Sequence, residues 1–210
     1  MKTTIGITAL IALGATAIAQ NEHQHHPPRS AEEYLQILND PKREAWQKPH
    51  EVVMALDLKP GEVVADIGAG GGYFARRFAL HVHRVYAVDI DAKLLEAAAQ
   101  GAPANLQTVL AAPDDPKLEA QSADMVFFCD VLHHIENRPS YYNKLSRVLR
   151  PGGRIVVIDF YKKPLPVGPP PEMKLEESQV VAEFAAAGFD RLTSFDFLPY
   201  QYFLVFQRRK

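Results

Sequence analysis

The sequence predicts an α/β fold in which one seven-stranded, mostly parallel sheet is covered by helices on both faces. From residue 63 onward, short apolar runs alternate with helical segments, and these runs are apolar throughout, as strands buried on both faces are. The last two runs have no helix between them and are joined by Pro199-Tyr200. We therefore expect the sheet to end with an antiparallel C-terminal hairpin strand.

Two helices are expected before the sheet. Ser30 and Glu33 have the spacing of a capping box, in which each side chain accepts a hydrogen bond from the other residue's backbone. The first helix would carry Tyr34, Leu35, Ile37 and Leu38 on its apolar side and end at Asp40-Pro41. The second, over residues 49–57, would begin at Pro49 and bury Val52, Val53, Leu56 and Met54.

The alternation then runs to the C-terminus. Strands are expected over residues 63–67, 84–88, 106–111, 125–129, 154–160, 191–198 and 201–207. Helices are expected over residues 73–79, 92–99, 140–149 and 176–187, and Pro151-Gly152-Gly153 should end the third of these.

The N-terminal residues differ from the rest of the chain. Lys2, an interrupted apolar run and the small residues Ala17 and Ala19 predict a signal peptide over residues 1–19. We expect an exported protein, periplasmic or secreted, with no stable membrane insertion after cleavage. The alternative is a membrane tether through an uncleaved leader, although the run is shorter than the ~20 apolar residues of a spanning helix. Residues 20–29 would form a flexible tail rich in His and Pro, and residues 30–210 the domain.

Composition bears on several classes of partner. The formal net charge is -2 and no long run of Lys or Arg occurs, which argues against nucleic-acid binding. Cys129 is the sole cysteine, so no intramolecular disulfide can form. His23, His25 and His26 are close enough to chelate a transition metal, but no further ligands follow at fixed spacing, so we expect no structured metal site. We expect a monomer.

A glycine-rich loop follows the first expected strand, in Asp66-Ile67-Gly68-Ala69-Gly70-Gly71-Gly72. Glycines at such a junction let the backbone turn sharply and approach a ligand closely. The dinucleotide-binding pattern requires a glycine at position 73, where this chain has Tyr73. The loop therefore indicates a ligand site and disfavours a nicotinamide dehydrogenase.

Asp89 strengthens this interpretation. It ends the second expected strand, nineteen residues after Gly70, where a carboxylate can accept hydrogen bonds from both ribose hydroxyls. The alternative is that Asp89 caps the helix beginning near Ala92, although Asp91 is better placed for that role. Together the loop and Asp89 predict a nucleoside ligand at the carboxyl ends of the strands.

Residues 60–160 resemble the class I S-adenosyl-L-methionine (SAM)-dependent methyltransferases, and are most similar to the group containing the ubiquinone and menaquinone biosynthesis methyltransferases. The matching segments are VVADIGAGGGYFARRFA, VYAVDID, MVFFCDVLHHI and VLRPGGRIVVIDF, which cover about half of the chain in the family's order. The resemblance implies a Rossmann-like fold, S-adenosyl-L-methionine as cofactor and a small-molecule acceptor.

The resemblance also implies roles for single residues. Asp66, Gly68 and Gly70 would cradle the amino-acid part of the cofactor, with Gly72 completing the loop. Asp89 would hold the ribose, and Ile90 would lie against the adenine. The family usually carries a Gly-Asp-Ala type segment after the third strand, whereas this chain has Ala111-Ala112-Pro113-Asp114-Asp115. Asp114 is the candidate for the adenine contact.

Methyl transfer is an in-line displacement, which needs an aligned acceptor, exclusion of water, and a base only where the nucleophile carries a proton. The catalytic candidates follow the fourth strand: Asp130, His133 and His134. The histidines could instead serve a helix start or packing. Aromatic residues and a proline-rich lid over residues 166–171 would line the acceptor pocket, the aromatic candidates being Tyr73, Tyr161, Tyr200 and Tyr202. Trp46 would either cover the cofactor or anchor the first helix.

The alternative function is a catalytically silent protein of the same fold that binds SAM or another nucleoside as a sensor or scaffold. The loop and Asp89 support binding in either case and leave turnover open.

Overall fold

The structure is a computed structural model that describes residues 30–209. The expected signal peptide and the tail with His23, His25 and His26 lie outside the described residues.

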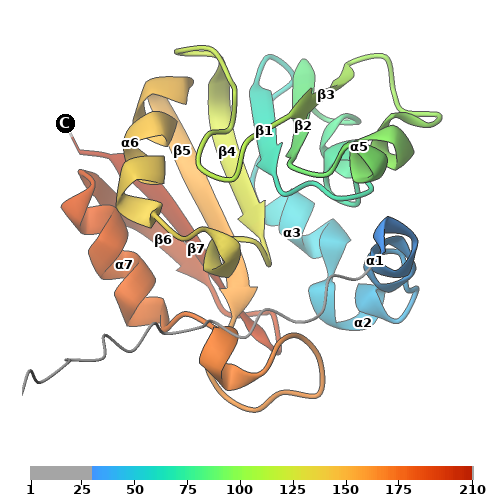
Figure 1. Cartoon of the computed structure of the whole chain (residues 1–210). Helices are drawn as coiled ribbons and strands as arrows, with labels where there is room; N and C mark the ends of the chain where they lie inside the picture. Colours follow the sequence, from blue (N-terminus) through green and yellow to red (C-terminus); the bar gives the residue numbers. More distant parts are fainter. Residues whose placement is uncertain (1–29, 210) are drawn as a thin grey trace, which may run out of the picture.

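A seven-stranded sheet forms the centre of the molecule (Figure 1), with strand order β3-β2-β1-β4-β5-β7-β6. The strands are β1 (Val63–Ile67), β2 (Arg84–Asp89), β3 (Leu106–Leu110), β4 (Ala123–Cys129), β5 (Leu149–Phe160), β6 (Phe189–Phe195) and β7 (Gln201–Arg208). Strand β7 pairs antiparallel with both β5 and β6, whereas the pairs among β1 to β5 are parallel. The predicted α/β fold and antiparallel C-terminal strand are confirmed, with that strand second from the edge of the sheet.

Helices cover both faces of the sheet because its central strands are apolar on both sides. Helices α6 (Arg138–Val148) and α7 (Glu177–Ala186) pack on one face, where Tyr142 stacks on Phe184 at a ring-centroid distance of 4.3 Å and Tyr141 lies against Phe128 of β4. Helices α3 (Pro49–Ala55) and α4 (Ala75–Phe78) pack on the other, where Phe78 meets Phe127 at a ring-centroid distance of 4.9 Å. Helix α5 (Ala92–Ala99) contacts β2 and β3. This two-sided core fixes the strand ends on which the site is built.

The N-terminal helices differ in part from expectation. Helix α1 (Ala31–Leu38) has the predicted capping box between Ser30 and Glu33, yet none of its residues is buried. Helix α2 (Arg43–Gln47) was not predicted, and Lys48, at φ 45°, separates it from α3. In α3 the expected burial of Met54 is wrong, since 61% of that residue is exposed.

Some boundaries also shift. Strand β5 begins at Leu149, so Pro151-Gly152-Gly153 lies inside the strand and not in a loop after α6. A register shift between Ala123 and Met125 in the pairing of β4 with β5 accommodates this segment. Helix α4 is shorter than the expected 73–79 because Gly72, at φ 83°, and Tyr73 still belong to the loop.

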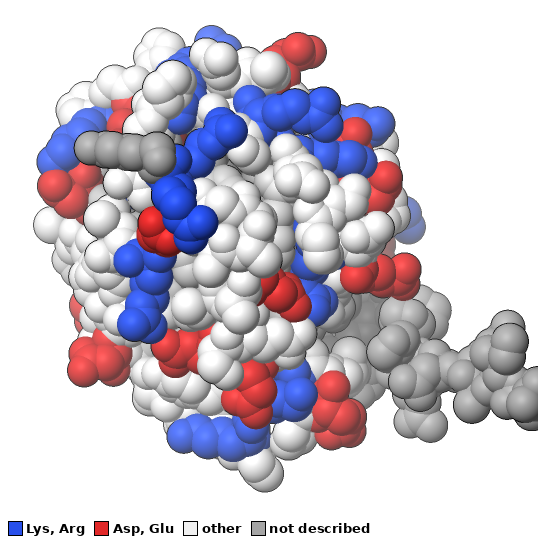
Figure 2. Space-filling model, turned by 90° about the vertical axis from the view of Figure 1, so that its left-hand side faces the viewer, with Lys and Arg blue, Asp and Glu red and all other residues white. Residues whose placement is uncertain are grey.

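Between residues 30 and 209, no helix combines the length and apolar character needed to cross a membrane. On the face turned toward the viewer in Figure 2, acidic and basic side chains are interspersed. Two ion pairs involve the C-terminal segment of the chain: Asp190 pairs with Arg209, and Glu177 of α7 pairs with Arg191.

Candidate active site

The predicted site residues of β1, β2 and β4 meet at the carboxyl ends of these strands. The strand order reverses there, because β2 and β3 lie on one side of β1 while β4 and β5 lie on the other. In open parallel sheets, the crevice at such a reversal is where ligands bind.

The glycine loop requires glycine at three positions. Gly68, Gly70 and Gly72 have φ angles of 70°, 54° and 83°, which side-chain-bearing residues seldom adopt. A Cβ at Gly68 would also lie 2.3 Å from Cγ2 of Val131, directly after β4. The backbone N–H groups of Gly68 and Ala69 both donate to the carbonyl of Val88, at 2.7 and 3.0 Å. The loop is thus held against β2 and packed on the residue that leads into η1 (Leu132–His134).

Asp66 carries an unsatisfied polar atom. Only 3% of the residue is exposed, and within residues 30–209 its Oδ2 has no hydrogen-bond partner. Burial raises the pKa of this carboxyl to about 8, and the nearby charge of Asp89 adds to the rise, while the backbone N–H of Ala75 and the charge of Arg43 oppose it. A buried carboxyl with a free oxygen is suited to a ligand that brings a cation or a hydrogen-bond donor.

Asp89 links the loop to β2. Its Oδ2 accepts a hydrogen bond from the Gly70 N–H at 2.8 Å, and its Oδ1 accepts one from the Asp91 N–H at 3.0 Å. Each carboxylate oxygen has a second lone pair for a further donor, such as a ribose hydroxyl. The capping alternative for Asp89 is excluded, because the Asp91 side chain accepts from Lys93 N and Leu94 N at the start of α5.

The two residues predicted to contact adenine, Ile90 and Asp114, have different surroundings. Ile90 is 60% exposed beside Asp89, which leaves an apolar side chain available for a flat ring. The Asp114 carboxylate lies 3.1 Å from Lys144 Nζ on α6, and 76% of its side chain is exposed. Asp114 therefore has a protein partner, and its contact with adenine stays a prediction, as do the cofactor roles of the loop glycines.

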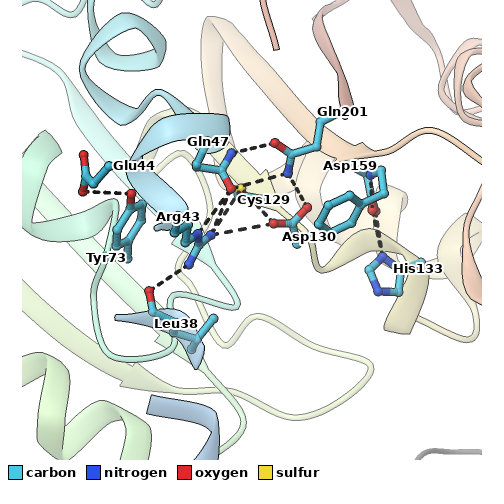
Figure 3. A network of polar contacts seen from close by, with 11 residues as sticks. Leu38, Arg43, Glu44, Gln47, Tyr73, Cys129, Asp130, His133, Asp159 and Gln201 are labelled. Atoms are coloured by element: carbon cyan, nitrogen blue, oxygen red, sulfur yellow. Dashed lines mark hydrogen bonds and ion pairs between the residues drawn. The ribbon is translucent and has the colours of Figure 1, made fainter. Parts of the chain in front are cut away.

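Asp130 ends a chain of buried polar side chains that reaches the N-terminal helices (Figure 3). Gln201 Nε2 donates to Asp130 Oδ1 at 2.6 Å, Gln47 Nε2 donates to Gln201 Oε1 at 2.9 Å, and Arg43 Nη2 donates to Gln47 Oε1 at 3.2 Å. Arg43 Nη2 also lies 3.7 Å from Asp130 Oδ2. Burial raises the Asp130 pKa to about 6, against the opposing charge of Arg43.

Three members of this chain were not predicted from sequence: Arg43, Gln47 and Gln201. The first two lie four residues apart in the unpredicted helix α2, and Gln201 starts an apolar strand. The one available signal was Gln201 itself, a polar residue at the start of an otherwise apolar run.

His133 forms a pair with a residue that sequence reasoning missed. Its Nδ1 lies 2.9 Å from Oδ1 and 3.0 Å from Oδ2 of Asp159, which is fully buried (Figure 3). Burial lowers the His133 pKa, but the charge and hydrogen bond of Asp159 outweigh it, so the pKa is raised above its ordinary value. The His134 ring, 4.2 Å away between centroids, is exposed. The signal for Asp159 was a single acid in the apolar run IVVIDF.

The aromatic candidates have several environments. Trp46 packs against Phe160 and Tyr200, with ring centroids 5.7 and 6.4 Å away, and so anchors α2 to the C-terminal strands. Tyr73 lies beneath the guanidinium of Arg43, 4.2 Å from its ring. Tyr202 is buried, and its hydroxyl has no hydrogen-bond partner in the described part of the chain. Their contact with an acceptor stays a prediction.

Helix α1 lies on the glycine loop. Its Leu38 Cδ1 is 2.7 Å from where a Cβ of Gly70 would stand, and Leu35 Cδ2 is 2.6 Å from that of Gly71. A cavity of about 640 Å³ lies beside these contacts. Its lining comes from the N-terminal helices, the loop, α4 and α5: Leu35, Asn39, Asp40, Pro41, Glu44, Gly71, Tyr73, Arg76, Arg77, Ala97 and Gln100. The loop is therefore covered from the side of α1.

Residues 65–157 match the family described as a methyltransferase domain. The fold is shared with a SAM-dependent methyltransferase from Aquifex aeolicus, at a TM-score of 0.79 and 22% identity over 85% of this chain and 98% of that one. The family match covers less than half of the chain, and the matched segment contains the glycine loop, Asp89 and Asp130.

Two curated methyltransferases are similar to about half of this chain. Phosphoethanolamine N-methyltransferase 1 of Arabidopsis thaliana is 26% identical over 121 residues, which are 54% of this chain and 24% of that protein. The 27-O-demethylrifamycin SV methyltransferase of Amycolatopsis mediterranei is 34% identical over 119 residues, 54% of this chain and 44% of that protein. The chain thus spans only about a quarter of the plant enzyme's length and less than half of the bacterial one's. The expected similarity to the ubiquinone and menaquinone group stays a prediction.

Proposed function

We propose that this protein is a SAM-dependent methyltransferase that transfers a methyl group to a small-molecule acceptor by in-line displacement. The observation that carries the proposal is that two carboxyls lie at the glycine loop. Asp66 is buried and its Oδ2 has no partner within residues 30–209, and Asp89 accepts a hydrogen bond from the Gly70 N–H. The match to a methyltransferase domain and the methyltransferases among its relatives support it.

The residues present fit the cofactor. Asp66 offers a hydrogen-bond acceptor to the ammonium group in the amino-acid part of the cofactor, and Asp89 retains lone pairs for the ribose hydroxyls. Gly68, Gly70 and Gly72 keep the loop free of side chains where the ligand would approach. When bound, S-adenosylmethionine supplies an electrophilic methyl group on a sulfonium.

The protein's own residues would then align the acceptor and exclude water. Asp130, held by Gln201 and faced by Arg43, lies at the end of β4 next to the loop. Helix α1 and Arg43, whose Nη1 donates to the Leu38 carbonyl at 3.3 Å, would cover the site from the N-terminal side. We assign these residues to positioning and shielding.

The test is to incubate the protein with methyl-labelled SAM and a small-molecule fraction of cell extract. Two products are measured: the label transferred to the acceptor and the S-adenosylhomocysteine formed. We expect turnover by the wild type and its loss in Asp89→Ala. Asp190→Ala, the same change at an exposed ion pair on β6, is the matched control and should keep activity. A wild type that binds S-adenosylhomocysteine without turnover would favour the silent binding protein instead.

We also propose that the protein is exported, on the basis of the leader-like residues 1–19. Fractionation of cells with detection of the mature N-terminus tests the location. Recovery of uncleaved protein in the cytosol would contradict it.

A further inference from the structure

We propose that Asp159 positions His133 as a general base, so that the acceptor of this methyltransferase is a hydroxyl compound, an alcohol or a phenol. This inference rests on the proposed function and deepens it. A hydroxyl is a weak nucleophile until its proton is removed, whereas a neutral amine or a thioether attacks through a lone pair already available.

The geometry fixes the histidine. Both oxygens of Asp159 lie within 3.0 Å of His133 Nδ1, and Oδ1 also accepts the Phe160 backbone N–H at 2.8 Å. With the carboxylate ionised, Nδ1 carries the proton that is donated to Asp159. The lone pair of the neutral ring is then on Nε2, on the opposite side of the ring.

The location of the pair links it to the cofactor loop. His133 lies in η1, two residues after Val131, whose side chain packs where a Cβ of Gly68 would stand. Asp159 lies near the carboxyl end of β5, beside β4. The pair therefore belongs to the same edge of the sheet as Asp66 and Asp130, where the acceptor would have to lie.

Four charged or titratable groups face His133 from the elements packed around it. Asp159 of β5 and Asp130 at the end of β4 raise its pKa, and Lys174, in the segment before α7, lowers it. Lys174 is buried and its Nζ donates to the Lys163 carbonyl at 2.9 Å. His134 is the fourth, with its ring tilted by 46° against the His133 ring at a centroid distance of 4.2 Å.

Methyl transfer to a hydroxyl group releases one proton. An acceptor oxygen lone pair forms the new O–C bond as the C–S bond breaks, and the electron pair of that bond stays on sulfur. The hydroxyl proton goes to His133 Nε2 and then to solvent. The products are a methyl ether, neutral S-adenosylhomocysteine and one proton.

The decisive variant is Asp159→Asn, which keeps an oxygen for the Phe160 N–H and so preserves the backbone contact. NMR titration of the His133 ring in the protein saturated with S-adenosylhomocysteine should show its pKa falling by about one unit or more, since a neighbouring negative charge is lost. The affinity for S-adenosylhomocysteine should not change. A wild type that does not bind S-adenosylhomocysteine would instead contradict the proposed function itself.

Activity supplies the second measurement. With the same extract fraction and SAM labelled with ¹³C in its methyl group, the carbon chemical shift of the product distinguishes a methyl on oxygen from one on nitrogen, sulfur or carbon. We expect an O-methyl product, and a rate that rises with pH through the raised His133 pKa because the neutral ring is the base. Asp159→Asn should move that rise to lower pH and reduce the plateau rate by about 10- to 100-fold.

Two further variants complete the test. His133→Gln should abolish the pH-dependent rise, and Asp190→Asn, the same chemical change at an exposed site, should leave the profile as in the wild type. A methyl group found on sulfur, nitrogen or carbon, or a His133 pKa that does not fall in Asp159→Asn, would overturn the proposal. A purely structural pair would lower stability without moving the pH profile.

Discussion

Asp66 shows how a single residue can be placed for a ligand at a cost to the unliganded fold. Its carboxyl is buried and one oxygen has no partner among residues 30–209, so ionisation in the folded state is disfavoured. Residues of this kind are retained for binding and not for stability.

The destabilisation caused by ionising buried Asp66 depends on pH, and Asp66→Asn should remove that dependence. Unfolded Asp66 loses its proton near the ordinary value of 3.8, but the folded residue keeps it up to about pH 8. Its contribution to stability is therefore fully present below about pH 4 and is lost as the pH rises toward 8. We expect the free energy of unfolding in urea to fall more steeply between pH 5 and 8 for the wild type than for the variant. Equal slopes would contradict this.

Gly68 should be intolerant of a side chain for two separable reasons. Gly68→Ala meets both a φ of 70° and the Val131 side chain at 2.3 Å, whereas Gly152→Ala meets a φ of 81° with no atom within 4 Å. The strain alone costs about 1–2 kcal/mol. In chemical denaturation, we expect Gly152→Ala to lower the free energy of unfolding by about that amount. Gly68→Ala should lower it by about 1–3 kcal/mol more, the range for overpacking. Similar losses would show that Val131 moves aside freely.

At the scale of elements, α1 is only loosely attached to the core of the described chain. It buries none of its residues, and its contact with the loop is made by Leu35 and Leu38. Such an element should open locally at a lower free energy than the sheet.

The capping box of α1 allows the local opening of this helix to be measured. Ser30→Ala removes the oxygen that accepts from Glu33 N at 3.2 Å, which should cost the helix about 1 kcal/mol. We expect faster amide hydrogen exchange confined to α1, with an unchanged melting temperature for the core. Ser178→Ala, at an exposed position in α7, is the control and should leave α1 exchange unaltered. Unchanged α1 exchange in Ser30→Ala would mean that contacts with the loop hold the helix.

The elements that sequence predicted best are those with local determinants. Strand β1 and helix α5 have their expected bounds, because an apolar run and the Asp91 cap define them without help from distant residues. Helix α2 was missed because its five residues lie between two proline-bounded segments and form only when Arg43 and Gln47 are buried. The polar chain of Asp130 was not predictable for the same reason, since Gln47 and Gln201 are 154 residues apart.

At the scale of the whole molecule, the candidate site joins the two ends of the described chain. Helix α2 near the N-terminal end, the loop after β1, the turn after β4 and strand β7 each supply a side chain or backbone group. The methyltransferase domain match ends at residue 157, so Asp159 and Gln201 lie beyond it. The proposed cofactor half of the site was predictable from sequence motifs, whereas the proposed acceptor half depends on the tertiary fold.

Calorimetric titration with S-adenosylhomocysteine, comparing the wild type with Asp89→Ala, tests the central claim most directly. The variant loses the charged acceptor for the Gly70 N–H and for the ribose, while the Asp91 cap of α5 is kept. We predict saturable binding by the wild type and an affinity about 10- to 100-fold weaker in Asp89→Ala, as expected for losing hydrogen bonds to a charged group. A folded wild type that gives no binding heat at several temperatures, or a variant that binds equally well, would contradict the assignment of this loop as the cofactor site.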